Sequence, residues 1–194
     1  MIPKIIFRYS PIYDELWGEK RGKKIKDYLS SKKILNYIKK VEKLWRKDEK
    51  KVLTELSKII KLKWKEKQIY CYVVERCIPF SDPLTLPVYE KYPDYFIDIL
   101  IHELIHQLIF TQNEEETRKA WNYIWRKYKR ETKKTKTHIP LHAIHTHIYL
   151  KFYGEERLKR DIKLLSHLKD FKKSWKIVRK EGYQKIIKEF VKRI

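Results

Sequence analysis

Residues 96–110, FIDILIHELIHQLIF, constrain the fold more than any other stretch of the chain. Their apolar side chains would cover most of the circumference of a helix, and such a helix belongs in a protein core. The polar residues lie close enough in sequence to form one strip along that helix: Asp98, His102, Glu103, His106 and Gln107. Because a buried imidazole or carboxylate without a partner is costly, the strip predicts a compensating partner.

A zinc ion is the partner that fits this spacing. Histidines four residues apart project from one helix face about one turn apart, so His102 and His106 could bind the same ion. Glu103 would lie beside the ion, where it could accept a proton from an attacking water and deliver it to a leaving amine. The sequence therefore predicts a site for one Zn²⁺ ion with a general base next to it.

The five residues HELIH resemble the HExxH motif of the zincin metallopeptidases. The resemblance implies that His102 and His106 are zinc ligands, that Glu103 is the general base, and that the substrate is a peptide or protein. It also implies that the preceding strand, expected over residues 68–78, aligns the substrate through its backbone. On this basis we expect a zinc-dependent peptidase with a zincin-like fold.

A catalytic zinc ion usually has three protein ligands, so the motif predicts a third ligand downstream. The metzincin pattern is excluded, because Ile109 and Gln112 stand where that family has glycine and histidine. Gluzincins take a glutamate from a later helix, and Glu116 is the candidate for that arrangement. SprT-like zincins also have a third histidine, although it follows the motif sooner than His142 does here.

The distribution of histidines favours a histidine as the third ligand, because six of the seven lie between residues 102 and 147. A helix that begins at Pro140 would place His142 and His145 on one face, with His138 just before its first turn. We expect His142 to be the ligand, with His138, His145 and Glu116 as the alternatives.

Other polar residues near the motif carry less specific expectations. Asp98 is either a group that orients a metal ligand or an ordinary acid of the first helical turn. His147 is expected to face the solvent or to have a secondary role, and no role is assigned to His167. Tyr149 or Tyr153 could stabilise an oxyanion, but the sequence does not choose between them.

We expect one domain over residues 1–194, of helix-dominated α+β class, with a small sheet packed on the active-site helix. Basic helices are predicted over residues 20–67, the first of them beginning near Ile25 and Tyr28. The catalytic core would cover about residues 68–154, and two further helices would follow over residues 155–194. The individual expectations are a strand near residues 3–13, a proline-rich loop over residues 79–93, and a linker over residues 130–137.

The chain has 47 Lys and Arg against 25 Asp and Glu, a formal net charge of +22. Such a charge favours a polyanionic partner such as nucleic acid, but the composition also resembles that of heat-adapted proteins. Two alternative functions follow. One is a basic nucleic-acid-binding module stapled by zinc, and the other is a protease that acts on nucleic-acid-bound proteins, as in the SprT-like zincins.

The cysteine content and the hydropathy of the chain indicate the cellular compartment that we expect for the protein. Cys71 and Cys77 cannot build a disulfide framework, and the first residues lack the apolar core of a signal peptide. No apolar run approaches the ~18 residues that a membrane span needs. We therefore expect a cytoplasmic protein, and nothing in the sequence indicates an oligomeric state.

Overall fold

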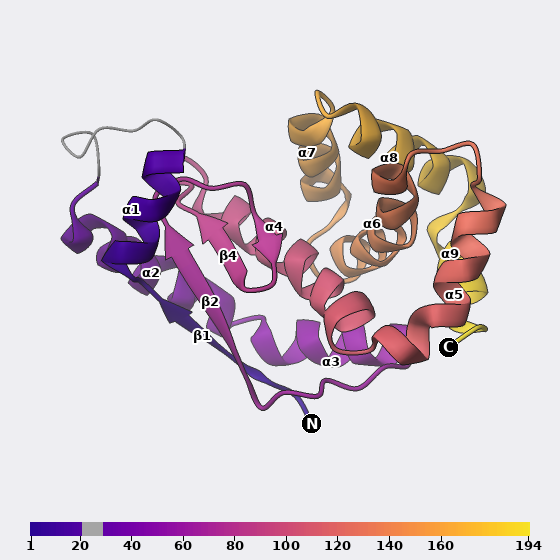
Figure 1. Ribbon diagram of the computed structural model, residues 1–194, viewed down its shortest axis with the longest axis horizontal. Helices are drawn as coiled ribbons and strands as arrows, with labels where there is room; N and C mark the ends of the chain where they lie inside the picture. Colours follow the sequence, from indigo (N-terminus) through magenta and orange to yellow (C-terminus); the bar gives the residue numbers. More distant parts are fainter. Residues whose placement is uncertain (21–28) are drawn as a thin grey trace. The chain divides into compact units, whose positions relative to one another are not determined.

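The structure is a computed structural model that describes residues 1–20 and 29–194. Helices dominate these residues and a four-stranded sheet accompanies them, which confirms the predicted α+β class (Figure 1). The chain divides into two compact units. Unit 1 comprises Met1–Leu53 and Trp64–Gln107, and unit 2 comprises Thr54–Lys63 and Leu108–Ile194. That the two units form one domain stays a prediction.

Unit 1 contains the sheet, whose strand order is β1-β2-β4-β3. The parallel strands are β1 (Lys4–Arg8), β2 (Gln68–Val74) and β4 (Leu84–Pro87), and β3 (Phe80–Ser81) pairs antiparallel with β4. The predicted N-terminal strand is confirmed over Lys4–Arg8, but it does not reach residue 13, because Pro11–Lys20 form helix α1. The strand predicted to begin at residue 68 is confirmed as well. That strand ends at Val74 rather than at residue 78, because the Glu75 N–H donates to the carboxylate of Asp14 instead of to a strand.

The proline-rich segment holds two short strands where only a loop was predicted. β3 begins after Pro79 and β4 ends at Pro87, so neither strand has a proline in its interior. This placement suits a residue that has no N–H to donate to a sheet. β4 is defined by its pairing with β2, in which Tyr72 faces Thr85, and β3 is defined by its pairing with β4, in which Phe80 faces Thr85. No local sequence pattern predicts these pairings.

The helices of unit 1 are α1 (Pro11–Lys20), α2 (Ser31–Arg46) and α4 (Pro93–His106), and α3 (Glu49–Ile60) passes from unit 1 into unit 2. α2 and α3 confirm helices within residues 20–67, but Ile25 and Tyr28 lie outside the described residues. α1 shows no apolar stripe, since Ile12 and Leu16 are exposed, and it is not predicted from the sequence.

α4 begins at Pro93, as predicted, and packs against α2 and β4. Phe96 anchors its first turns, with ring centroids 5.9 Å from Phe7 and 5.8 Å from Tyr37. Beyond His106 the chain continues as the π-helical turn η2 (Gln107–Thr111). The core of unit 1 thus lies between the sheet and α4.

Unit 2 is built of helices around α6 (Lys133–Phe152), which packs against α7 (Glu155–Leu165), α8 (Lys169–Glu181) and α9 (Tyr183–Val191); α5 (Glu114–Lys127) packs against α9. Gly154, with φ +87°, follows the end of α6, as predicted. Gly182 has the same φ and separates α8 from α9, so the C-terminal part holds three helices rather than two.

The predicted linker over residues 130–137 is wrong, because α6 already begins at Lys133. Its start is set by Thr132, whose side-chain oxygen accepts the Thr135 N–H at 3.0 Å. Pro140 therefore lies inside α6 rather than at its start, and His138 is a helical residue. Among the described residues, no helix is both long and apolar enough to cross a membrane.

Candidate metal centre

The HELIH segment occupies the last turns of α4, and its polar strip is buried as the sequence predicts, except for His106, which is half-buried. Every residue of α4 from Phe96 to Ile105 is buried, including Asp98, which is 0% exposed. Asp94 is the acid of the first turn, so Asp98 is not an ordinary first-turn acid. A helix enclosed to this degree holds its polar side chains in fixed positions.

His102 and His106 lie next to each other on one face of α4. Their ring centroids are 5.1 Å apart and the rings meet edge to face at 68°. His102 is 5% exposed, whereas His106 is half-buried. Two imidazoles one turn apart on a rigid helix are the donor pair that a zinc ion takes from an HExxH segment.

Glu103 lies in an apolar environment between the two histidines in sequence. Glu103 is only 6% exposed, and this burial raises the pKa of its carboxyl group to about 8. Burial also raises the pKa of the Cys71 thiol on β2, with a smaller contribution from the charge of Glu103. The carboxyl group of Glu103 therefore has little water around it.

Gln107 connects the end of α4 to the edge of the sheet. Its side-chain Nε2 donates to the carbonyl of Ser81 on β3 at 2.7 Å, which also fixes the orientation of the amide. The Oε1 atom is buried and has no hydrogen-bond partner among the described residues. The sequence placed Gln107 on the polar strip but did not reveal this contact, because β3 was not predicted.

β2 lies inside the sheet, between β1 and β4, so it is not an edge strand that could take up a substrate. The expectation that residues 68–78 align the substrate is therefore corrected. The edge strand that contacts α4 is β3. Its position at the edge leaves one side of its backbone without a neighbouring strand in the described sheet.

In unit 2, His138, His142 and His145 lie on one face of α6, and the rings of His138 and His142 are 5.4 Å apart. His142 is 0% exposed and stacks on Trp175 of α8, with ring centroids 4.0 Å apart and an interplanar angle of 6°. Its Nδ1 atom is 2.8 Å from the Ser174 hydroxyl. These contacts place His142 in the packing between α6 and α8.

His145 is also enclosed in unit 2, where its ring centroid lies 4.6 Å from that of Tyr149. Burial lowers the pKa of His145 to about 3, and the positive charge of Arg157 adds to this effect. Tyr149 itself belongs to the core cluster of Leu158 and Trp175. Both tyrosines considered from the sequence take part in this packing, Tyr149 within the cluster and Tyr153 against it.

His138 has the hydrogen bond that commonly orients a metal ligand. Its Nδ1 atom is 2.8 Å from the carbonyl oxygen of Lys134. Because a carbonyl only accepts, Nδ1 carries the proton and the lone pair lies on Nε2, the arrangement that metal-bound histidines adopt. Burial lowers the pKa of His138 to about 4, so the ring is neutral near pH 7.

The remaining candidates occupy different environments. Glu116 is exposed in the first turn of α5, and His167 is exposed on the C-terminal side of α7. His147 is half-buried, and its Nε2 atom lies 2.8 Å from the carboxylate of Glu55, which also binds the Lys151 ammonium at 2.7 Å. His147 is therefore partly exposed and, in addition, paired with Glu55, a contact that its position in the sequence did not predict.

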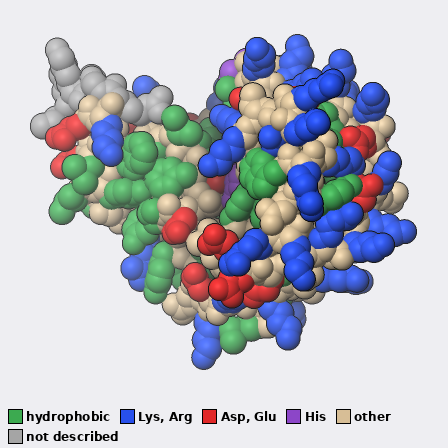
Figure 2. Space-filling model, turned by 45° about the vertical axis from the view of Figure 1, so that its right-hand side comes forward, with side chains coloured by type: hydrophobic (Ala, Val, Ile, Leu, Met, Phe, Trp, Pro, Cys, Tyr) green, Lys and Arg blue, Asp and Glu red, His purple; other side chains and the backbone are tan. Residues whose placement is uncertain are grey.

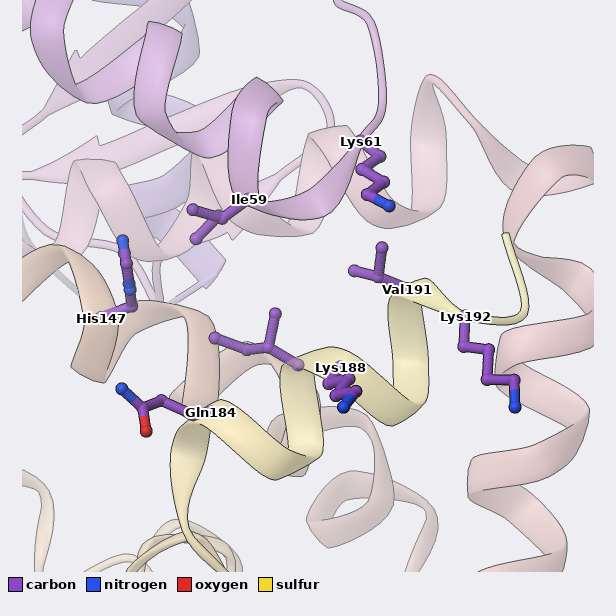
Figure 3. Close-up of a pocket in the computed structure, with 8 residues that line it drawn as sticks. Ile59, Lys61, His147, Gln184, Lys188, Val191 and Lys192 are labelled. Atoms are coloured by element: carbon purple, nitrogen blue, oxygen red, sulfur yellow. The ribbon is translucent and has the colours of Figure 1, made fainter.

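His147 also borders a groove of about 530 Å³ in unit 2, shown in Figure 3. The apolar part of its lining comes from Ile59, Ile187 and Val191, and no carboxylate lines it. The three other histidines of α6 do not line this groove. It lacks a combination of an acid, a base and a metal ligand, and it is not a candidate reaction site.

The chain was also compared with known proteins. No protein-family model, no curated protein and no solved structure matches it. The function is therefore inferred from the arrangement of its own residues, and two groups carry that inference: the His102, Glu103 and His106 segment of α4, and the histidine face of α6.

Proposed function

We propose that this protein is a zinc-dependent peptidase with a zincin-like catalytic arrangement. The observation that carries the proposal is the buried HELIH segment of α4, in which His102 and His106 lie side by side and Glu103 is enclosed beside them. A chance HExxH sequence would have no reason to bury His102 and Glu103 together on one rigid helix, since burial of such groups is costly.

We assign the third ligand to His138 rather than to His142, the residue that the histidine spacing favours. The carbonyl of Lys134 supports this assignment, because it fixes the tautomer that leaves Nε2 of His138 able to bind an ion. His142, by contrast, uses Nδ1 to contact Ser174 and its ring face to stack on Trp175.

Three histidines fit a catalytic zinc ion, since three protein ligands leave a fourth position open for water or substrate. When bound, zinc supplies Lewis acidity, which acidifies water and polarises a peptide carbonyl. Glu103 accepts the proton of the attacking water and delivers it to the amine that leaves. Its apolar surroundings suit this role, because a carboxylate with little hydration is a stronger base than one in bulk water.

β3 is the strand that we assign to substrate alignment. An extended peptide can add to the edge of a sheet through backbone hydrogen bonds, and β3 is the sheet edge that contacts α4. Gln107 holds β3 at the level of the HELIH segment through its bond to Ser81.

Zinc stoichiometry tests the ligand assignment. We expect purified wild-type protein to bind one zinc ion per chain, measured by elemental analysis after dialysis. His138→Phe should bind much less zinc, because the ring is kept for packing but its nitrogens are lost. His142→Phe is the matched control on the same helix face and should keep the wild-type content.

The opposite pattern would move the third ligand to His142, and a wild-type protein without zinc would overturn the metal centre. A structure with four protein ligands on the ion would support the zinc-stapled module instead of the peptidase, because the open position would be missing. Circular dichroism of each variant separates loss of metal from loss of fold.

A further inference from the structure

The positive charge of this protein is concentrated in unit 2. This unit has 27 Lys and Arg against 11 Asp and Glu, a net charge of +16, whereas unit 1 has 20 against 14, a net charge of +6. Figure 2 shows Lys and Arg side chains spread over the face of unit 2 that is turned toward the viewer. The charge therefore needs an explanation that is specific to unit 2.

One helix of unit 2, α8, carries its cations on a single face. With 3.6 residues per turn, six basic residues fall within about 120° of the helix circumference. They are Lys169, Lys172, Lys173, Lys176, Arg179 and Lys180, here called the α8 basic stripe. All six are exposed, and the stripe contains no acidic residue.

Two carboxylates, Glu131 and Asp170, line the same hollow as four lysines of the stripe, but the stripe forms few ion pairs. Lys173 lies 3.3 Å from the carboxylate of Glu131, and none of the other five forms an ion pair within the described part of the chain. Asp170, the acid nearest in sequence, lies off the stripe and accepts a hydrogen bond from Thr135 at 2.8 Å. Five cations on one face therefore repel one another unless an external anion neutralises them.

The opposite face of α8 is committed to the interior of unit 2. Ser174, Trp175 and Val178 are buried, and Trp175 stacks on His142 of α6. α8 thus has no exposed apolar face to insert into a lipid interface, which an interfacial membrane helix needs. A partner of the stripe must offer closely spaced negative charges without requiring an apolar contact.

We propose that the α8 basic stripe binds the phosphate backbone of nucleic acid. From Lys169 to Lys180 the stripe extends about 16 Å at 1.5 Å per residue, the length over which one strand presents roughly five phosphates. The contacts are to the backbone, so binding is independent of base sequence and falls steeply with salt. This proposal does not rest on the peptidase, because the HELIH segment and the stripe are separate sets of residues.

The test is the binding of a fluorescent single-stranded 20-mer oligonucleotide, followed by anisotropy as a function of salt. The variant is Lys169→Gln, Lys176→Gln and Lys180→Gln together. Its matched control is Lys32→Gln, Lys39→Gln and Lys43→Gln on α2, which has the same spacing, the same loss of charge and exposed side chains. Both triple variants keep good helix formers at every changed position.

We expect the α8 triple variant to reduce the slope of log K against log salt by about 2 to 3, and the affinity near 0.1 M salt by about 10-fold or more. The α2 triple variant should change the slope by less than about 1. Glu103→Gln should bind the oligonucleotide as the wild type does. Oligonucleotide binding would therefore be observed even if the protein proved not to be a peptidase.

Equal losses in the two triple variants would overturn the proposal, since binding would then follow net charge and not the stripe. Absence of oligonucleotide binding by the wild type would also overturn it. So would binding of the stripe to vesicles of anionic lipid without binding to the oligonucleotide. Circular dichroism confirms that each variant is folded.

Discussion

α4 and α6 both bury histidines at helical spacing, but they do so in different ways. On α6 the rings of His142 and His145 pack against Trp175 and Tyr149, as core side chains do. On α4 the histidine pair is accompanied by a buried carboxyl group, Glu103, whose pKa is raised by the lack of water. The comparison teaches that a buried histidine can be an ordinary core residue, and that the buried carboxyl group next to the histidine pair is what distinguishes α4 from α6.

The largest expected effect concerns α4 and tests the role of Glu103 as the general base. Glu103→Gln removes the proton acceptor but keeps the size of the side chain, so we expect peptide hydrolysis to fall by about 10²- to 10⁴-fold. Hydrolysis of a fluorogenic peptide mixture measures it. Zinc content and circular dichroism should not change. Full activity in this variant would show that Glu103 is not the base.

The second prediction tests the α6 side, where His142 is treated as a core side chain. His142→Ala removes the stack on Trp175 and the contact with Ser174, and we expect the free energy of unfolding to fall by about 3 kcal/mol. Urea unfolding measures it. His142→Phe should recover most of the loss, because it restores a ring against Trp175. A folded His142→Ala protein of wild-type stability would contradict the packing role.

The third prediction concerns acid. The pKa of His145 is lowered to about 3 by burial, while in the unfolded chain it is near 6.5. Between these values the unfolded state binds more protons, so stability is complete above pH 6.5 and decreases as the pH falls toward 3. Thermal unfolding from pH 7 to pH 4 measures the decline. His145→Leu should make that decline shallower, and an unchanged pH profile in this variant would exclude His145 as its source.

The smallest effect concerns the start of α6, which carries the histidine face. Thr132→Ala removes the cap that accepts the Thr135 N–H, and we expect a loss of about 1 kcal/mol in the free energy of unfolding. Thr137→Ala is the control within the same helix, since its hydroxyl only contacts the Lys133 carbonyl. If both variants lose the same stability, the cap does not define the start of α6.

The comparison of these helices also shows what a sequence can predict. α4 was predictable from residue 93 onward because two local signals, a proline at its start and a continuous apolar run, both favour a helix there. The start of α6 was not, because Lys133 to Thr137 resemble a polar linker and Pro140 resembles a helix start. Tertiary packing of α6 against α8 and α9 outweighs these local signals.

The residues of the candidate site also differ in whether the sequence alone could identify them. His102, Glu103 and His106 could be named from their spacing, since that spacing lies within one helix. The third ligand could not, because the choice among His138, His142 and His145 depends on what surrounds each ring: the carbonyl of Lys134 at one, and the aromatic rings of Trp175 and Tyr149 at the others. β3 and its contact with Gln107 required the sheet pairing itself.

The path of the chain between the units has a consequence for how the protein can be dissected. The backbone passes between units 1 and 2 three times, within α3, before Trp64 and after Gln107, so neither unit is one continuous segment. A fragment that begins at Leu108 would lack Thr54–Lys63 and with it Glu55, the carboxylate that binds His147 and Lys151. Single-cut truncations therefore remove part of whichever unit they aim to isolate, and only a spliced gene that rejoins the separate segments would yield either unit entire.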